Sequence, residues 1–164
     1  MELKKATSKD ISVIQEIAKS SWTTTYSTIL SKDQISYMLD LMYCEKELKN
    51  HLEEQINYHY YLLLDENKTI GFIGFEHNYE LSTTKLHRIY LLKEASGKNF
   101  GKQALAFIEE QMKKVNNNRL ILTVNKKNKA FEFYKKVGFE VYDEAVFDIG
   151  NGYVMDDYLM EKKS

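Results

Sequence analysis

The chain has 164 residues, 43% of them hydrophobic and 29% charged, and a formal net charge of −1 at pH 7. This size and balance are typical of one soluble globular domain, which we expect to span residues 1–164. No apolar run reaches the length of a membrane span, and residues 1–10 lack the apolar stretch of a secretion signal, so we expect a cytoplasmic protein with no membrane partner. The single cysteine excludes an internal disulfide and a cysteine-based metal cage, and the four histidines lack ligand spacing, so we expect no metal.

The N-terminal part of the chain is predicted to form a short strand and three helices. Residues 4–6 have the pattern of a strand. The sequences T-x-x-D at residues 7–10 and S-x-x-Q at residues 31–34 have the form of capping boxes, and apolar residues at helical spacing follow each of them. Residues 45–56 are expected to form a third, more polar helix.

The rest of the chain predicts strands interrupted by two helices. Strands are expected at residues 58–64, 70–79, 83–92, 120–124, 139–149 and 153–161, and helices at residues 101–115 and 128–137. This order predicts an α/β fold with a mixed, mostly antiparallel sheet of about seven strands and helices on both faces. A Rossmann fold is not expected, because it would place a glycine-rich turn after an early strand in a repeating βαβ series.

Residues 89–102, with the sequence IYLLKEASGKNFGK, carry the strongest sign of a binding site. An apolar strand leads into a loop with Gly97 and Gly101, and the loop leads directly into a helix. Free backbone N–H groups and the positive end of the helix dipole favour a phosphate or pyrophosphate at such a place. Residues 86–138 carry 12 basic and 4 acidic side chains, which suits a polyanionic ligand. Because no nucleic-acid-binding motif is evident, we expect a phosphorylated cofactor and no nucleic acid partner.

A second motif, N-x-x-N-x-A-x-x-x-Y-x-x-x-G-F, spans residues 125–139. Together with the loop it resembles the GCN5-related N-acetyltransferase (GNAT) superfamily, in which a Q/R-x-x-G-x-G/A loop binds the pyrophosphate of acetyl-CoA. The loop departs from that pattern, because Ser96 stands where Gln or Arg is usual and Asn99 where the first glycine is usual. Since Asn adopts the left-handed backbone conformation more readily than most residues, we expect a loosened but working site. Residues 21–39 resemble more specifically the bacterial PaiA-type spermidine/spermine N-acetyltransferases.

The resemblance implies a single GNAT-like domain with acetyl-CoA as cosubstrate. It implies direct transfer of the acetyl group from the thioester to a primary amine, with a polyamine such as spermidine or spermine as a candidate acceptor. For Asn128, capping of the following helix is a strong alternative role, and the two roles can coexist. The residues that the resemblance implies for cofactor binding are Tyr90, Leu91, Leu92, Gly97, Lys98, Asn99, Phe100, Gly101, Lys102, Asn125, Asn128 and Tyr134.

The resemblance also implies catalytic groups. Tyr134 matches the family's tyrosine that protonates the leaving thiolate, although a core aromatic on a helix is the alternative. The family's strand glutamate aligns with Lys85, so that general base is absent. His87 lies two residues further, on the same strand face, and could accept the proton of the amine. Glu76, His77 and ordered water are the alternatives.

The acceptor side is less defined by the sequence. Trp22, Tyr26 and Glu76 are expected to contact the substrate, with core packing an equal alternative for the two aromatic residues. The acidic ends of the chain would attract a cationic amine. Two other functions stay open, namely acetylation of a protein N-terminus, a lysine or an antibiotic amine, and a CoA-binding regulatory module without turnover. The final hairpin offers an edge strand, so a homodimer also stays open.

Overall fold

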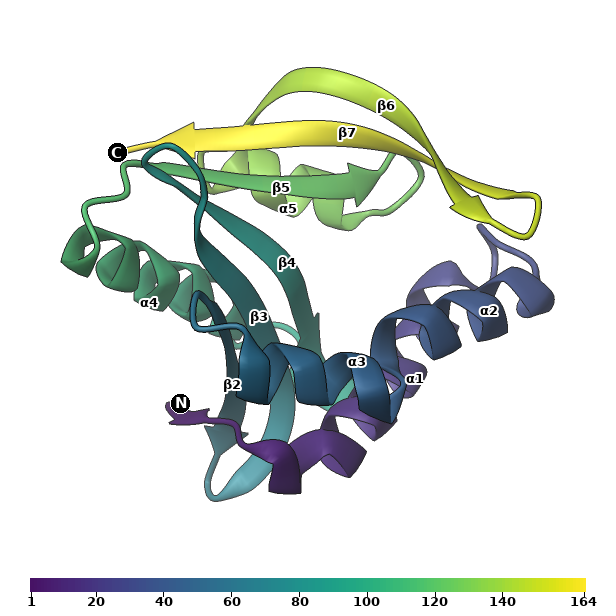
Figure 1. Ribbon diagram of the computed structural model, residues 1–164, viewed down its shortest axis with the longest axis horizontal. Coiled ribbons are helices and arrows are strands. Elements are labelled where there is room, and N and C mark those ends of the chain that lie inside the picture. The colour runs from purple at the N-terminus through teal and green to yellow at the C-terminus, as the bar shows by residue number, and fades with distance from the viewer.

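The sheet of this protein has seven strands in the spatial order β1-β2-β3-β4-β5-β7-β6 (Figure 1). The computed structural model describes residues 1–164. The elements are β1 (Glu2–Lys5), η1 (Ser8–Asp10), α1 (Ile11–Tyr26), α2 (Lys32–Tyr43), α3 (Glu45–Lys49), η2 (Asn50–Glu54), β2 (Tyr58–Asp65), β3 (Lys68–Glu80), β4 (Thr83–Leu91), η3 (Lys93–Ala95), α4 (Phe100–Lys114), β5 (Arg119–Asn125), α5 (Ala130–Lys136), β6 (Glu140–Gly150) and β7 (Tyr153–Lys163). Only β4 and β5 pair in parallel. The predicted order of elements and the mixed, mostly antiparallel sheet are confirmed.

The element boundaries differ from the prediction at a few places. The first strand is Glu2–Lys5 and begins earlier than expected. The third helix is the short α3, which continues as a π-helical turn at Asn50–Glu54. The S-x-x-Q sequence forms only half of a capping box. The Ser31 hydroxyl accepts a bond from the Gln34 backbone at 3.1 Å, but the Gln34 side chain donates to the Val154 carbonyl of β7 at 3.0 Å.

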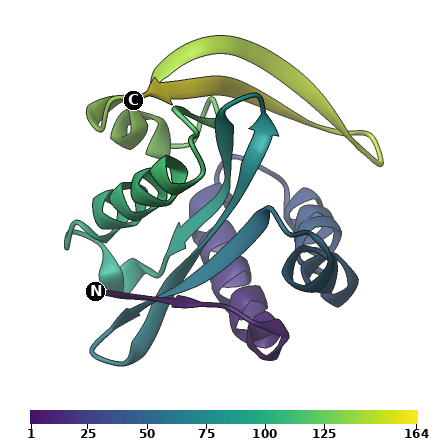
Figure 2. The ribbon, with the colours of Figure 1, turned by 60° about the vertical axis from the view of Figure 1, so that its left-hand side comes forward.

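Helices cover both faces of the sheet, as predicted (Figure 2). Helix α4 packs on one face, where Ile108 and Met160 are fully buried, and Ile14 of α1 is fully buried on the other face. Phe72 and Ile73 are adjacent on β3 and enter different cores, because successive strand residues point to opposite faces. None of the helices is long and apolar enough to cross a membrane.

Strands β4 and β5 separate partway along their length, so that the sheet opens into two arms (Figure 1). Their pairing is limited to Thr83–Lys85 against Arg119–Ile121. A bulge follows in β4, because Arg88 pairs with Gly74 of β3 while Leu86 pairs with Phe75, which leaves His87 as the extra residue. Since a bulge bends its strand and increases the local twist, β4 turns away from β5 just beyond their last shared pair.

The tip of the β6–β7 hairpin connects the C-terminal arm of the sheet to α2 (Figure 1). The Tyr37 hydroxyl of α2 donates to the Ile149 carbonyl at 2.8 Å, and the Tyr37 ring lies 5.3 Å from the ring of Tyr153. The bond from Gln34 to β7 adds a second contact at this place. These contacts between α2 and the hairpin tip therefore connect the two arms of the sheet across the opening.

Candidate active site

A continuous cleft runs between the two arms of the sheet. One cavity of about 300 Å³ lies where β4 and β5 separate, and the C-terminal part of α1 lines it as well. A second cavity of about 510 Å³ lies between the loop of residues 95–102 and α5. The residues that line both are Ile89, Leu91, Ser96, Ala130 and Tyr134. The cleft therefore leads from the glycine-containing loop to the inside of the split sheet.

The loop before α4 has the backbone shape of an anion-binding site. Gly97 has a φ of +80° and Asn99 a φ of +62°, both in the left-handed region. The Asn99 side chain makes no capping bond, so its contribution is the conformation itself. No turn or loop hydrogen bond engages the backbone N–H groups of residues 97–102, and the first N–H groups of a helix have no partner within it. These groups, with the helix dipole, fit a diphosphate.

The structure brings most of the loop residues predicted for cofactor binding to this cavity. Lys98 is different, because its Nζ lies 3.4 Å from Asp65 Oδ2 and its side chain lines none of the cleft. A Cβ atom at Gly101 would lie 3.2 Å from Cζ of Phe133, so glycine at this position lets α4 pack closely against α5. The predicted loop residues that line the cavity are Gly97, Asn99, Phe100, Gly101 and Lys102, and Leu91 and Tyr134 line it as well.

The backbone of β4 supplies further free groups to the cleft. The N–H of Leu92 donates to the Ile70 carbonyl at 2.8 Å and is not available to a ligand. Because successive N–H groups along a strand point in opposite directions, those of Ile89 and Leu91 face the opening toward β5. Leu91 thus fits the predicted cofactor contact, whereas the backbone N–H of Leu92 does not.

Tyr134 lies where the two cavities of the cleft join. Its side chain is buried, and its hydroxyl has no side-chain hydrogen-bond partner. Burial first, and then the neighbouring Tyr90, raise the pKa of Tyr134 well above the ordinary value of a phenol. The ring also packs against Phe139, with 5.6 Å between the ring centroids. Tyr134 is therefore both a core aromatic and a protonated hydroxyl beside the cleft.

The two predicted asparagines hold local turns and line different cavities. Asn128 Oδ1 accepts a bond from the Ala130 N–H at 2.9 Å and so caps α5, while its Nδ2 donates to the Tyr26 hydroxyl at 3.2 Å. Asn128 also lines the cleft, so its capping bond leaves the predicted contact with the cofactor possible. Asn125 Oδ1 accepts from the Lys127 N–H at 2.9 Å. Its side chain lines a third cavity instead of the cleft.

This third cavity, of about 190 Å³, adjoins the cleft; we call it the Trp22 cavity, and its walls include Trp22, Tyr26, Tyr90, Met155 and Asp157. The rings of Trp22 and Tyr26 lie 4.5 Å apart, and Trp22 Nε1 donates to the Tyr90 hydroxyl at 2.9 Å. Trp22 and Tyr26 are 3% and 7% exposed, so they belong to the core and also face the cavity. Tyr26 and Tyr90 line the cleft as well, which places the Trp22 cavity directly beside it.

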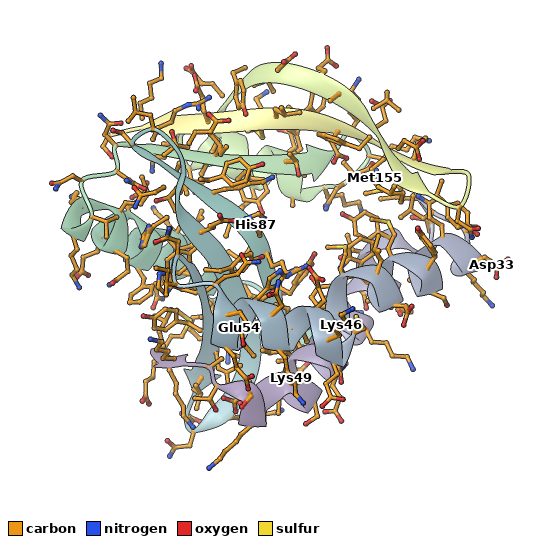
Figure 3. The ribbon with its side chains drawn as sticks, in the orientation of Figure 1. Asp33, Lys46, Lys49, Glu54, His87 and Met155 are labelled. Carbon is orange, nitrogen blue, oxygen red and sulfur yellow. The ribbon has the colours of Figure 1, made fainter.

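His87 lies at the opening between the two arms of the sheet (Figure 3) and lines both the cleft and the Trp22 cavity. Burial first, and then Lys85 and Arg88, lower the pKa of His87 to about 3. The ring is therefore neutral at neutral pH, and its Nε2 donates to Glu76 Oε1 at 3.0 Å. Glu76 lines none of the three cavities, so the predicted contact with the substrate is not direct. Its hydrogen bond to His87 links it to a residue that lines two of them. His77 also lines none of them.

The sequence analysis missed a buried arginine beside the site. Arg88 donates to the Tyr58 hydroxyl at 3.2 Å, to the Tyr60 hydroxyl, and to the Met42 carbonyl at 3.1 Å. These bonds join β2, β4 and the end of α2 without a carboxylate in direct contact with the guanidinium. Its guanidinium also lies 4.7 Å from the centre of the Tyr43 ring. An arginine flanked by Leu86 and by the apolar run of residues 89–92 was the available signal.

The second missed residue is Asp157 on β7. It is 7% exposed and lines the Trp22 cavity, and its Oδ1 is enclosed without a hydrogen-bond partner. Burial first, and then Asp156, raise the pKa of Asp157 to about 6. Asp156 points to the outer face and pairs with Lys126 at 3.1 Å. Two adjacent aspartates in a strand must face opposite sides, and this was a signal that one of them lies inside.

Comparisons with known proteins show the family and the fold of the chain. Residues 28–155 match the acetyltransferase (GNAT) domain family. The chain is 32% identical to a spermidine N(1)-acetyltransferase of Thermoplasma acidophilum over 167 residues, which cover 99% of this chain and 97% of that protein. A crystal structure of the PaiA N-acetyltransferase of Thermoplasma acidophilum with coenzyme A matches with a TM-score of 0.84 and 29% identity, over 99% of this chain and 98% of that one. A GCN5-related N-acetyltransferase from Rhodopseudomonas palustris has the same fold, with a TM-score of 0.82 and 16% identity over 99% and 95% of the two chains.

Proposed function

Because the chain belongs to the GNAT family and is therefore an acetyl-CoA-dependent N-acetyltransferase, we propose that its acceptor is a primary amine of a polyamine such as spermidine or spermine. The observation that carries this proposal is the relationship, over nearly the full length of both chains, with a spermidine N(1)-acetyltransferase. The Trp22 cavity supports it independently. Aromatic faces of Trp22, Tyr26 and Tyr90 attract a cation, and the methionine side chains of this cavity suit a methylene chain.

The residues of the cleft fit the cosubstrate. Acetyl-CoA supplies the acetyl group as a reactive thioester. The N–H groups of residues 97–102 and the start of α4 would bind its diphosphate, and Lys102 adds a positive charge there. The N–H groups of Ile89 and Leu91 face the opening, where they would orient the arm that leads to the thioester and donate to its carbonyl oxygen.

Tyr134 would donate the proton that the leaving thiolate needs. Its raised pKa keeps the phenol protonated at neutral pH, and the residue lines both cavities of the cleft. A general acid at this point contributes about 10² to 10⁴ to the rate of such reactions.

His87 would take the proton from the attacking amine and pass a proton on to Glu76. A neutral ring that donates from Nε2 to Glu76 leaves Nδ1 as the acceptor. Transfer of the amine proton to Nδ1 and of the Nε2 proton to Glu76 keeps the ring neutral. This relay avoids a stable imidazolium, which the low pKa of His87 disfavours. An acceptor that enters as an ammonium ion would first lose one proton to water and so become a neutral amine. The proton that His87 takes is the second one, which the nitrogen loses as it bonds to the acetyl carbon.

The release of free thiol from acetyl-CoA across a panel of amines tests the proposal. The panel contains spermidine, spermine, a peptide with a free N-terminus, a lysine peptide blocked at its terminus, and an aminoglycoside. We expect the highest kcat/KM with a polyamine. A higher kcat/KM with either peptide or with the aminoglycoside would contradict the polyamine assignment and leave acetyl transfer as the established part.

A further inference from the structure

We propose that Asp157 binds the non-reacting ammonium group of a diamine or polyamine in the Trp22 cavity and thereby determines the preference for multiply charged acceptors. This inference rests on the proposed function, which it makes more specific. It assigns a substrate-recognition role to a residue of β7, on the arm of the sheet opposite the predicted catalytic histidine.

The first argument is the state of the carboxylate. Asp157 is 7% exposed, and its Oδ1 is enclosed without a hydrogen-bond partner. A buried charge without a partner is strongly unfavourable, so a carboxylate in this state is suited to a cationic ligand. Lys126, which follows the end of β5 on this arm, is already paired with Asp156 at 3.1 Å and with Glu144 at 2.7 Å.

The second argument is the shape and chemistry of the walls. Trp22, Tyr26 and Tyr90 supply aromatic faces, which attract an alkylammonium ion. Met155 and two further methionines supply flexible apolar contacts for methylene groups. A volume of about 190 Å³ suits one charged arm of an amine and excludes a folded protein segment.

The third argument is the position of the cavity relative to the reaction. The Trp22 cavity shares Tyr26, His87 and Thr123 with the cleft between β4 and β5. Figure 3 shows His87 and Met155 on opposite sides of the opening between the arms. An amine with its charged end at Asp157 can therefore extend its other nitrogen past His87 toward the thioester.

The titratable groups that face Asp157 are few. Tyr26 comes from α1, and His87 and Tyr90 come from β4, while Asn125 of β5 and Phe147 of β6 do not titrate. The adjacent Asp156 points to the outer face but also raises the pKa of Asp157. None of these groups carries a positive charge at neutral pH, because the tyrosines are protonated and His87 is neutral. The ammonium of the substrate would thus be the only cation in the cavity.

The test compares 1,4-diaminobutane with 1-aminobutane, which differ by one ammonium group, and also uses spermidine. Asp157→Asn keeps the shape of the side chain and removes its charge. Asp156→Asn, on the outer face of the same strand, is the matched control. We expect Asp157→Asn to raise the KM for spermidine and 1,4-diaminobutane by about 10-fold or more, which corresponds to about 1.4 kcal/mol, with kcat and the kinetics of 1-aminobutane little changed. At a pH well above 6, where Asp157 is ionised with or without Asp156, Asp156→Asn should keep the wild-type KM for each amine.

Three results would overturn the proposal: an unchanged KM for the diamine in Asp157→Asn, an equal rise for both amines, or a loss of kcat for both. The melting temperature and the affinity for CoA, measured by calorimetry, verify that the variant is folded. If wild type acetylates no amine, the proposed function fails. Calorimetric titration of the CoA complex with 1,4-diaminobutane still tests Asp157, because binding should be lost in Asp157→Asn alone.

Discussion

At the scale of single residues, Asn99 shows how the loop works without the glycine that is usual in its family. Its φ of +62° lies in the left-handed region, and its side chain makes no capping bond. For most residues with a Cβ this conformation is about 1–2 kcal/mol higher in free energy than the right-handed one, but the cost is smaller for asparagine. The departure from the family pattern therefore preserves the backbone shape that exposes the N–H groups.

Substitution of Asn99 tests whether that shape binds CoA. Asn99→Gly should keep the affinity for acetyl-CoA and the stability of the protein. Asn99→Val should destabilise the fold by about 1–2 kcal/mol and weaken acetyl-CoA binding, because a β-branched residue resists a positive φ. Asn116 also has a positive φ, of +58°, at the other end of α4. Asn116→Val should lose similar stability without a loss of affinity in calorimetry; equal losses of affinity in both valine variants would contradict the assignment.

Tyr134→Phe keeps the ring in the core and removes the proton that we assign to the leaving thiolate. We expect kcat to fall by about 10²-fold or more, with the dissociation constant of acetyl-CoA little changed. Tyr61→Phe is the control, since Tyr61 packs on Phe107 with 4.8 Å between the rings and lines none of the three cavities. A wild-type kcat in Tyr134→Phe would leave this residue a core aromatic only.

Asp157 also predicts a pH dependence. Its raised folded-state pKa of about 6 means that Asp157 of the free protein is mostly neutral below about pH 6 and gains its charge as the pH rises through that value. Diamine binding needs the charge. The KM for 1,4-diaminobutane should therefore fall as the pH rises from 5 to 7, and this fall should be absent from Asp157→Asn. Steady-state kinetics with 1-aminobutane, measured in parallel, separates this effect from the ionisation of the reacting amine.

At the scale of the elements, the contact between α2 and the β6–β7 hairpin shapes the Trp22 cavity. Ile149 and Met155 line this cavity and belong to the hairpin, whose position depends on the bond from the Tyr37 hydroxyl to the Ile149 carbonyl. A Cβ atom at Gly150 would lie 2.5 Å from the Tyr37 hydroxyl, so glycine allows this close approach. The wall of the Trp22 cavity therefore includes a hairpin that is held against α2, a helix far from it in the sequence.

Tyr37→Phe removes this hydrogen bond and keeps the ring. We expect a loss of about 1 kcal/mol in the free energy of unfolding and a severalfold rise in the KM for the amine, with the KM for acetyl-CoA unchanged. Tyr158→Phe is the control on the same hairpin, because Tyr158 packs on Phe131 instead of α2. If the KM for the amine stays at its wild-type value, the hairpin does not position the acceptor.

The sequence predicted the elements well because their signals are local. Helical spacing, the capping pattern at residues 31–34 and the loop at residues 97–101 each depend on neighbours in the chain. The bulge at His87 and the pairing of Lys98 with Asp65 depend on the register of β3 and on a distant turn, and no local pattern reports them. For Asp157, the adjacent pair of aspartates indicated that one of them lies inside, but its cavity forms only where β4, β5, β6 and β7 meet α1 and α2, and no local pattern reports that.

At the scale of the whole molecule, the cleft separates two arms that share few backbone bonds. Because acetyl-CoA contacts both arms in the proposed site, its binding should stabilise the fold. At a concentration 100 times its dissociation constant, a ligand adds about 2.7 kcal/mol, which for a chain of this size is about 5–10 °C in melting temperature. Thermal scans with and without acetyl-CoA measure this. Asn99→Val should require more ligand for the same shift, and no shift at saturation would contradict the site.

The separation of β4 from β5 also has a consequence for how the protein avoids self-association. Beyond Lys85 and Ile121 each strand has an unpaired backbone edge in the interior of the sheet rather than at its border. Such an edge is a template for a foreign strand. The C-terminal part of α1 lines the cavity at this split and so narrows the space in which a foreign strand could pair. Partial undocking of α1 before the cosubstrate binds would therefore make the unpaired edges of both strands more accessible to a neighbouring chain.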